Sequence, residues 1–303
     1  MIPPAISGKT RVVAILGDPV SHTRSPAMHN AAFAALGLDY VYVALRVEPR
    51  DLRRAMTGIR ALGIWGLNVT VPHKERILPL LDRLTPRARE IGAVNTVFRQ
   101  GDELVGDNTD ADGFRLALHD IGVRARGKRI VVLGAGGSAR AVVCTLVRGG
   151  ARSLTLLNRT QRRAESLAEL ARKLGGSEVR TGLLEEATIP DTLAGVGLVV
   201  HCTSLGLDGR SRPPLALSAL PEKAAVYDLV YGAEPTPLMR EARSEGHLAA
   251  DGRGMLLHQA ALAFRRWTRR RPPLETMVEA LNGASAGPGY VMLSSTISRP
   301  GRR

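Results

Sequence analysis

Short apolar runs alternate with longer segments of mixed polarity along most of the chain. Runs rich in Val, Ile and Leu predict strands at 12–16, 40–45, 66–71, 129–133, 154–157, 197–202 and 225–230. Apolar residues spaced three or four positions apart predict helices at 26–36, 50–62, 112–120, 138–148, 162–174, 255–267 and 273–282. This alternation indicates an α/β protein in which helices cover mostly parallel sheets.

Turn and capping residues mark the start of the first helix. The strand at 12–16 ends at a Gly-Asp-Pro turn, and Ser25 is the predicted N-cap of the helix that follows. Pro26 then occupies the first helical position, where the amide hydrogen that proline lacks has no helical acceptor. The length of 303 residues allows two domains, each with its own core.

A glycine-rich turn follows the predicted strand 129–133 and opens a helix. Its residues are Gly134, Ala135, Gly136, Gly137, Ser138 and Ala139, which fit the pattern G-x-G-x-x-G/A. Glycines at these positions let the backbone approach a pyrophosphate, and the helix amides then bind it. We expect a dinucleotide here, and the alternative is a tight turn without a ligand.

The end of the second strand of this unit indicates which dinucleotide is bound. An NAD-binding unit usually carries an acidic residue there, whereas this chain has Asn158, Arg159 and Thr160, followed by Arg162 and Arg163. Guanidinium groups bind a 2′-phosphate strongly, often through two hydrogen bonds. NADP is therefore the predicted cofactor, and the alternative is a basic helix start that faces solvent.

One lysine stands at the end of a polar strand in a chain that otherwise uses arginine. Lys74 follows the segment Asn-Val-Thr-Val-Pro-His, and lysine can release a proton when its surroundings favour the neutral amine. Asp107 and Asp110 lie in a second polar loop near the predicted domain junction. The alternative for Lys74 is a solvated loop lysine, and the alternative for the two aspartates is a turn-forming or capping role.

The net charge of +14 raises the question of nucleic acid. Most of the excess is arginine spread over many predicted helices, and only 265–271 and 299–303 are dense, with few aromatic residues nearby for base stacking. We expect an arginine-rich solvated surface and no nucleic-acid partner. No run of residues has the length and apolarity of a membrane helix, so we expect no membrane partner and a cytoplasmic protein.

The cysteines and histidines do not suggest a metal or disulfide framework. Cys144 and Cys202 each lie in an apolar run, so both are predicted to be buried and reduced. The histidines lack the spacing of metal ligands, and His22, His29 and His73 are interpreted as loop or helix surface residues. No metal is expected.

Nine ordered segments together resemble the shikimate dehydrogenase family, from residue 14 to residue 281. They are 17–30 (GDPVSHTRSPAMHN), 68–74 (NVTVPHK), 92–96 (GAVNT), 106–110 (GDNTD), the glycine turn, 158–160 (NRT), 227–231 (YDLVY), 236–238 (TPL) and 254–260 (GMLLHQA). The resemblance implies reversible hydride transfer between NADPH and the C3 carbonyl of 3-dehydroshikimate, a step toward chorismate and the aromatic amino acids. The cofactor carries the hydride, and the protein supplies position and electrostatics.

The resemblance also implies a role for each matching residue. Lys74 would be the general acid/base, paired with Asp110. Thr23, Ser25 and Tyr231 would bind the substrate carboxylate, and Thr70, Asn95 and Gln259 its hydroxyl groups. On the cofactor side, the match covers Gly134, Ala135, Gly136, Gly137, Ser138, Asn158, Arg159, Thr160, Arg163, and Leu229 and Gly252 as backbone contacts near the nicotinamide.

The implied organisation is an α/β substrate domain with a Rossmann-type domain inserted before its last helices. Residues 1–110 and 253–282 would form the substrate-binding domain and 111–252 the NADP-binding domain, with the active site in the cleft between them. Residues 283–303 are predicted to be a disordered tail. A monomer or homodimer is expected.

Three departures and two rival functions remain open at this point, and one departure is that the run 267–271 and the tail after residue 282 are more basic and longer than the resemblance requires. Thr23 stands where the family commonly has Ser, and His201 replaces the usual Asn, which puts a local backbone-capping bond in doubt. The nearer rival is a quinate/shikimate dehydrogenase with broader substrate or NAD use. The other is a non-enzymatic protein on the same fold that senses NADP or binds nucleic acid.

Overall fold

Two six-stranded sheets form the framework of the protein. The computed structural model describes residues 6–176 and 178–283. The first sheet contains β1 (Arg11–Gly17), β2 (Tyr40–Arg46), β3 (Gly66–Val69), β4 (Arg83–Leu84), β5 (Thr96–Gln100) and β6 (Glu103–Asp107), in the order β2-β1-β3-β5-β6-β4. Its pairs are parallel except that β5 runs antiparallel to both β3 and β6.

The second sheet is parallel throughout. It contains β7 (Arg129–Leu133), β8 (Ser153–Asn158), β9 (Glu178–Leu183), β10 (Val196–His201), β11 (Ala225–Asp228) and β12 (Leu248–Asp251). The order β12-β11-β10-β7-β8-β9 is that of a doubly wound dinucleotide-binding sheet, whose direction of winding reverses between β7 and β10. Ligands of such sheets bind beyond the carboxyl ends of the strands at that reversal.

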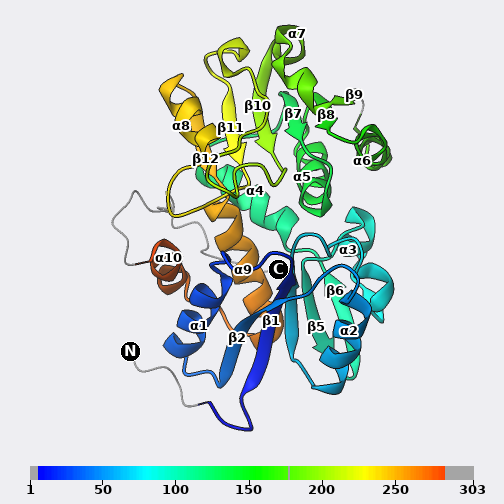
Figure 1. Ribbon diagram of the computed structural model, residues 1–303, viewed down its shortest axis with the longest axis vertical. Helices are drawn as coiled ribbons and strands as arrows, with labels where there is room; N and C mark the ends of the chain where they lie inside the picture. Colours follow the sequence, from blue (N-terminus) through cyan, green and yellow to red (C-terminus); the bar gives the residue numbers. More distant parts are fainter. Residues whose placement is uncertain (1–5, 177, 284–303) are drawn as a thin grey trace, which may run out of the picture.

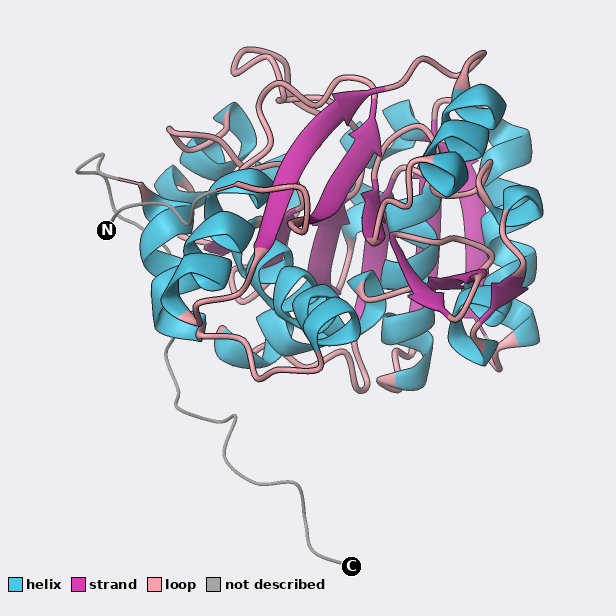
Figure 2. Cartoon of the chain, turned by 90° about the horizontal axis from the view of Figure 1, so that it is seen from below, coloured by secondary structure: helices cyan, strands magenta, loops and turns pink. Residues whose placement is uncertain are grey.

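Helices cover both sheets and connect them (Figures 1 and 2). They are α1 (Ser25–Ala35), α2 (Leu52–Ala61), α3 (Pro86–Ile91), α4 (Asp110–Asp120), α5 (Gly137–Arg148), α6 (Gln161–Lys173), α7 (Pro190–Leu193), α8 (Pro237–Ser244), α9 (Arg253–Thr268) and α10 (Leu274–Asn282). Short 3-10 turns are η1 (Leu78–Leu80), η2 (Leu184–Thr188) and η3 (Leu217–Ala219). In Figure 1, α4 and α9 lie at the level where the two sheets meet. In the described part of the chain, no helix is long and apolar enough to cross a membrane.

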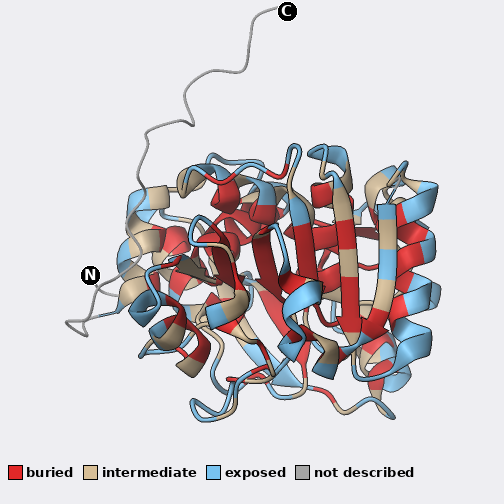
Figure 3. Cartoon of the chain, turned by 90° about the horizontal axis from the view of Figure 1, so that it is seen from above, coloured by how far each residue is buried: buried red, intermediate tan, exposed pale blue. Residues whose placement is uncertain are grey.

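After the second sheet the chain returns to the first one. Phe264 and Trp267 of α9 are buried in one cluster with Val13 of β1 and Phe33 of α1. Trp267 fills the space above Gly66, where a Cβ atom would lie 2.3 Å from the indole nitrogen, and it donates a hydrogen bond to the Val97 carbonyl. Figure 3 shows buried positions concentrated in the sheets and exposed ones on the outer helix faces. The last helices therefore complete the core of the first sheet.

Most predicted elements are present, and the omissions are short. The hairpin of β5 and β6 was not predicted as two strands, because its members are brief and the sequence around them was interpreted as turns. The edge strands β4, β9 and β12 and the helices α3, α7 and α8 were also not predicted. The proposed tail, apart from residue 283, lies outside the described residues.

Three local predictions are wrong. Helix α1 begins at Ser25 rather than after it, and the Ser25 hydroxyl does not cap the helix. His29 and His73 are buried rather than on the surface. His29 stacks on Tyr42 with ring centroids 4.5 Å apart, and His73 Nε2 lies 2.6 Å from the Val47 carbonyl oxygen. Both imidazole rings are therefore part of the core of the first sheet.

The two thiols differ in their surroundings, although both are free. Cys144 is buried as expected, and burial raises the pKa of its thiol to about 11. Cys202 is only partly buried and lines the cavity described below, which corrects the prediction of full burial. Burial also raises the pKa of the Cys202 thiol, so both cysteines are neutral near pH 7.

Candidate active site

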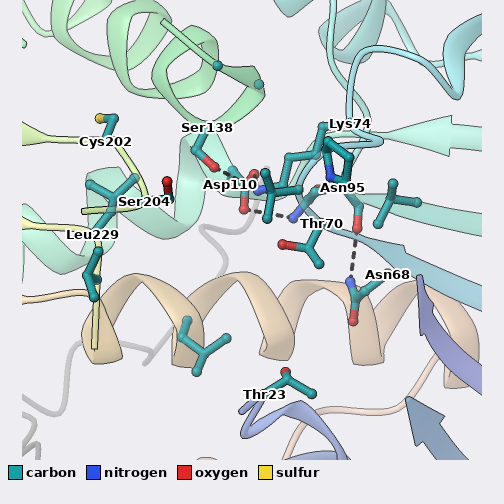
Figure 4. Close-up of a pocket in the computed structure, with 18 of the residues that line it drawn as sticks. Thr23, Asn68, Thr70, Lys74, Asn95, Asp110, Ser138, Cys202, Ser204 and Leu229 are labelled. Carbon is teal, nitrogen blue, oxygen red and sulfur yellow. Dashed lines mark hydrogen bonds and ion pairs between the residues drawn. The ribbon is translucent and has the colours of Figure 1, made fainter. Parts of the chain in front are cut away.

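A cavity of about 520 Å³ lies between the two sheets, at the carboxyl ends of their central strands. Its walls come from the loops after β1, β3, β7, β10 and β11 and from the inner face of α9. Figure 4 shows the side chains from the first sheet and α4 facing those from the second sheet across this space. Parts of the chain that are far apart in sequence therefore meet at one site.

Lys74 and Asp110 form an ion pair at the edge of the cavity. Lys74 Nζ donates to Asp110 Oδ2 at 2.6 Å and to the Ser138 hydroxyl at 2.9 Å. The two charged side chains are only 13% and 5% exposed. Asp110 is the first residue of α4, where the helix dipole favours a negative charge. Because an ammonium group has three donors, one remains for a ligand in the cavity.

Asn95 orients the Lys74–Asp110 pair through hydrogen bonds to its carboxylate and to the residues around it. Its side-chain nitrogen, which carries two hydrogens, lies 2.9 Å from Asp110 Oδ1 and from the Thr109 hydroxyl and 3.1 Å from Gln259 Oε1. Its side-chain oxygen accepts the Thr109 backbone amide at 2.7 Å. Asn95 is 2% exposed, so these bonds are largely shielded from water. The network joins the start of β5 to α4 and α9 and fixes the orientation of the carboxylate.

Hydroxyl groups gather at the other end of the cavity. Ser25 and Thr23 lie next to each other, with 3.3 Å between their hydroxyl oxygens. Burial raises the pKa of the Tyr231 phenol, although Thr23 beside it acts in the opposite direction, so the phenol remains a hydroxyl donor at neutral pH. Thr70 and Gln259 line the wall between these groups and Lys74. All predicted catalytic and substrate-binding residues thus face one cavity.

The sequence interpretation missed Asn68, although it lies in a quoted motif. Asn68 lines the cavity and is 4% exposed. Its side chain accepts from the Tyr42 hydroxyl at 2.7 Å and donates to the Asn95 carbonyl at 3.1 Å. The signal available was its position: a polar side chain within an apolar strand, directly before a polar loop. Thr203 and Ser204 also line the cavity and carried no such signal.

The glycine turn has the shape that a pyrophosphate requires. Gly134 has φ +105°, and a Cβ atom there would lie 3.0 Å from Cys202 and from Thr203. Gly136 is the N-cap of α5, with nothing within 4 Å of a Cβ position, while a Cβ on Gly137 would lie 2.6 Å from Lys74. No side chain caps α5 and no acidic residue lies in its first turn, so its amides can bind an anion. These residues fit a dinucleotide.

The predicted cofactor residues fall into two groups. Gly136, Gly137, Ser138, Arg163, Leu229 and Gly252 line the cavity, and Gly134, Ala135, Asn158, Arg159 and Thr160 lie outside its lining. Gly134 nevertheless adjoins β8, since its amide donates to the Leu157 carbonyl at 2.7 Å. Arg159 is exposed, and Arg163 forms an ion pair of 2.9 Å with Glu75 across the cavity mouth.

Family models match three stretches of the chain in order. A shikimate dehydrogenase substrate binding domain matches residues 15–97, a shikimate/quinate 5-dehydrogenase model residues 115–206, and a shikimate 5′-dehydrogenase C-terminal domain residues 252–281. A shikimate dehydrogenase (NADP(+)) of Geobacter metallireducens is 47% identical over 88% of this chain and 94% of its own length. This chain belongs to the shikimate dehydrogenase family.

Solved structures of this family have the same fold. A shikimate 5-dehydrogenase of Thermus thermophilus, in complex with NADP(H) and shikimate, superimposes with a TM-score of 0.78 at 39% identity, over 90% of this chain and 98% of its own. A quinate dehydrogenase of Corynebacterium glutamicum, in complex with NAD, gives 0.79 at 32% identity, over 88% and 97%. The fold alone therefore does not distinguish between the two substrates or the two cofactors.

Proposed function

We propose that this chain catalyses the reversible, NADPH-dependent reduction of 3-dehydroshikimate to shikimate on the route to chorismate and the aromatic amino acids. The observation that carries the proposal is the buried Lys74–Asp110 pair, which faces the same cavity as the amide-lined turn at the start of α5. One group can exchange a proton and the other can hold a dinucleotide, and reduction of a carbonyl needs both.

NADPH, when bound, supplies the hydride for the ring carbonyl. The protonated Lys74 amine donates its free hydrogen to the carbonyl oxygen as that oxygen becomes a hydroxyl, and in the reverse direction the neutral amine accepts it. Asp110 holds Lys74 in place by the 2.6 Å bond, and Asn95 fixes the other carboxylate oxygen. Such positioning keeps the donor within reach of the reacting oxygen.

Substrate recognition rests on the polar walls of the cavity. We infer that Thr23, Ser25 and Tyr231 bind the carboxylate and that Thr70, Asn95 and Gln259 bind ring hydroxyls. Because several of these groups are shielded from water, a substrate that lacks a matching hydroxyl would leave a buried polar group unpaired. Quinate differs from shikimate in its ring substituents and is expected to react more slowly.

Cofactor recognition is divided between backbone and arginine groups. The amides at 134–138 are proposed to bind the pyrophosphate, and Arg159 and Arg163 the 2′-phosphate, with Asn158 and Thr160 shaping the loop between them. Leu229 and Gly252 are packed closely enough that a Cβ on Gly252 would lie 2.1 Å from the Leu229 carbonyl oxygen. We propose that their backbone groups contact the nicotinamide.

We also propose the domain division 1–110 with 253–282, and 111–252. It is supported by the packing of α9 and α10 on the first sheet and by a core cluster on the second sheet whose buried members all lie between residues 131 and 242. The oligomeric state, the lack of a nucleic-acid partner and the cytoplasmic location stay predictions from the sequence.

The test is an absorbance assay at the nicotinamide band with purified protein, shikimate and NADP⁺. We expect NADPH to form in step with a product two hydrogens lighter than shikimate, and Lys74→Met to slow the formation of both about a thousandfold while leaving the fold intact. Comparable turnover of quinate with NAD⁺ would favour the rival dehydrogenase. No turnover of either substrate with either cofactor would contradict an enzymatic function.

A further inference from the structure

A buried chain of polar side chains lies behind the second-sheet wall of the cavity, and the proposed mechanism does not use it. His201 ends β10 and Asp228 ends β11, and they are 0% and 1% exposed. His201 Nδ1 lies 2.8 Å from Asp228 Oδ1, and its Nε2 lies 2.5 Å from the Thr203 hydroxyl. Both ring nitrogens of a fully buried histidine thus have a partner.

The bonds around Asp228 place a hydrogen on His201 Nδ1. Asp228 also accepts the Val230 amide at 2.9 Å and the Thr236 hydroxyl at 2.7 Å, so a proton on His201 Nδ1 completes its contacts. The Thr203 hydroxyl accepts the Leu205 amide at 3.1 Å and still has its own hydrogen and a lone pair for the contact with His201 Nε2. With a hydrogen on Nδ1, every polar group of this network has a partner.

The two segments that these hydrogen bonds connect are walls of the cavity. Residues 202–204 follow His201 and residues 229–231 follow Asp228, and both segments line the cavity. Figure 4 shows Cys202, Ser204 and Leu229 on the side opposite Thr70 and Asn95. The backbones of the two strand ends are also hydrogen-bonded, since the Leu229 amide donates to the His201 carbonyl at 2.9 Å. His201 therefore joins two cavity walls from behind.

These walls also adjoin the glycine turn. The Cys202 amide donates to the Leu133 carbonyl at 2.7 Å, and the methyl group of Thr203 lies 3.0 Å from the Cβ position of Gly134. A shift of this loop would therefore change the space beside the turn. The 2′-phosphate site proposed at Arg159 and Arg163 lies on the other side of the turn, after β8, and has no contact with His201 among the bonds described.

We propose that His201 is a positioning residue for the nicotinamide half of the cofactor. It holds the walls at 202–205 and 229–231 in the arrangement that receives the nicotinamide, and it touches neither substrate nor reacting atoms. This inference rests on the proposed function, since it assumes that a nicotinamide dinucleotide occupies the cavity. The adenosine half should bind independently of His201.

The experiment is calorimetric titration of the full-length protein with two ligands, NADP⁺ and adenosine 2′,5′-bisphosphate, which lacks the nicotinamide. His201→Leu keeps the approximate volume and removes both bonds. We expect it to weaken NADP⁺ about tenfold, as for the loss of a buried hydrogen bond, and to leave the bisphosphate within about twofold. His201→Asn, which can still donate to Asp228, should restore most of the NADP⁺ affinity.

Thr203→Val provides a second route if His201→Leu does not fold, because it removes the Nε2 bond from the other partner. It should weaken NADP⁺ and spare the bisphosphate in the same way. The matched control is His247→Asn, which alters a buried histidine near the same sheet that bonds the Leu217 carbonyl and does not line the cavity. It should lower the melting temperature without changing either affinity.

Equal weakening of both ligands, or no change in either, would overturn the positioning role. In the assay, the KM for NADP⁺ should rise about tenfold in His201→Leu, while the KM for shikimate stays constant. A wild-type protein without shikimate-dependent NADP⁺ reduction would instead show that the proposed function is wrong. The two failures are therefore distinguishable.

Discussion

The charged groups on the two sides of the cavity differ in how far they are shielded from water. On the substrate side, Lys74, Asp110 and Asn95 bond to one another and to their neighbours and are mostly shielded from water. On the cofactor side, Arg159 is exposed, and the Arg163 side chain is 54% exposed and pairs with Glu75. The substrate side is therefore ordered before a ligand binds, whereas the arginines of the cofactor side are exposed to solvent until a phosphate binds.

The difference follows from what each side has to do. Proton transfer requires a donor held at a defined distance, and an ordered, dry network provides that without reorganisation during the reaction. A phosphate can be bound by flexible arginines at an open edge, because attraction between full charges depends less on exact geometry. Substitutions on the substrate side should therefore affect turnover, and those on the cofactor side should affect affinity.

The largest effect is expected for Lys74→Met. Loss of the group that exchanges the proton should lower kcat about a thousandfold, within the range typical of general acid–base catalysis. The KM for NADP⁺ should change little, since the turn at α5 binds the cofactor through backbone amides. Steady-state rates and a circular dichroism spectrum would check both points. Undiminished turnover would show that the ordered network has another purpose.

The double variant Arg159→Ala/Arg163→Ala tests the cofactor side. Removing two charged donors should raise the KM for NADP⁺ about 10- to 100-fold and leave kcat within about twofold. The KM for NAD⁺, which has no 2′-phosphate, should stay the same. Arg162→Ala is the matched control, because Arg162 is an exposed arginine between the two that the proposal does not assign to the phosphate. An equal effect in that control would remove the basis for a specific phosphate site.

The stability of the substrate side should depend on His29. Burial lowers the pKa of His29 from 6.5 to about 3, so below pH 6.5 the unfolded chain binds a proton that the folded chain does not. The free energy of unfolding should therefore fall between pH 6.5 and pH 3, by about 2 kcal/mol at pH 5. Denaturant titrations of wild type and His29→Phe would measure it, and a parallel pH dependence in the two proteins would contradict it.

The smallest effect is expected for Glu75→Gln. An exposed ion pair contributes at most about 1 kcal/mol, so freeing Arg163 from Glu75 should strengthen NADP⁺ binding by up to about fivefold. Calorimetric titration at low and moderate salt would measure the change, which salt should reduce. Weaker NADP⁺ binding in this variant would mean that the ion pair supports the cofactor site instead of competing with it.

The sequence predicts the regular parts of the molecule and the type of chemistry, and it does less well where tertiary contacts decide. The strand at 129–133 and the glycine turn follow from local patterns, since apolar runs and glycine spacing act over a few residues. The burial of His29 depends on Tyr42, Phe264 and Trp267, which no local pattern places together.

The same distinction applies within the site. The motifs identify Lys74 and Asp110, but the sequence does not show that Ser138 accepts a hydrogen bond from Lys74 across the cavity. The sequence predicts only that Arg163 binds a phosphate, whereas the structure adds its ion pair with Glu75. Such contacts depend on how the two sheets face each other.

The most direct measurement is the ratio of kcat/KM for NADP⁺ to that for NAD⁺ with shikimate, repeated with quinate. An ordered substrate side and an arginine-marked cofactor side predict a ratio of at least about tenfold in favour of NADP⁺, and faster turnover of shikimate than of quinate. Equal efficiency with NAD⁺, or a preference for quinate, would contradict the account.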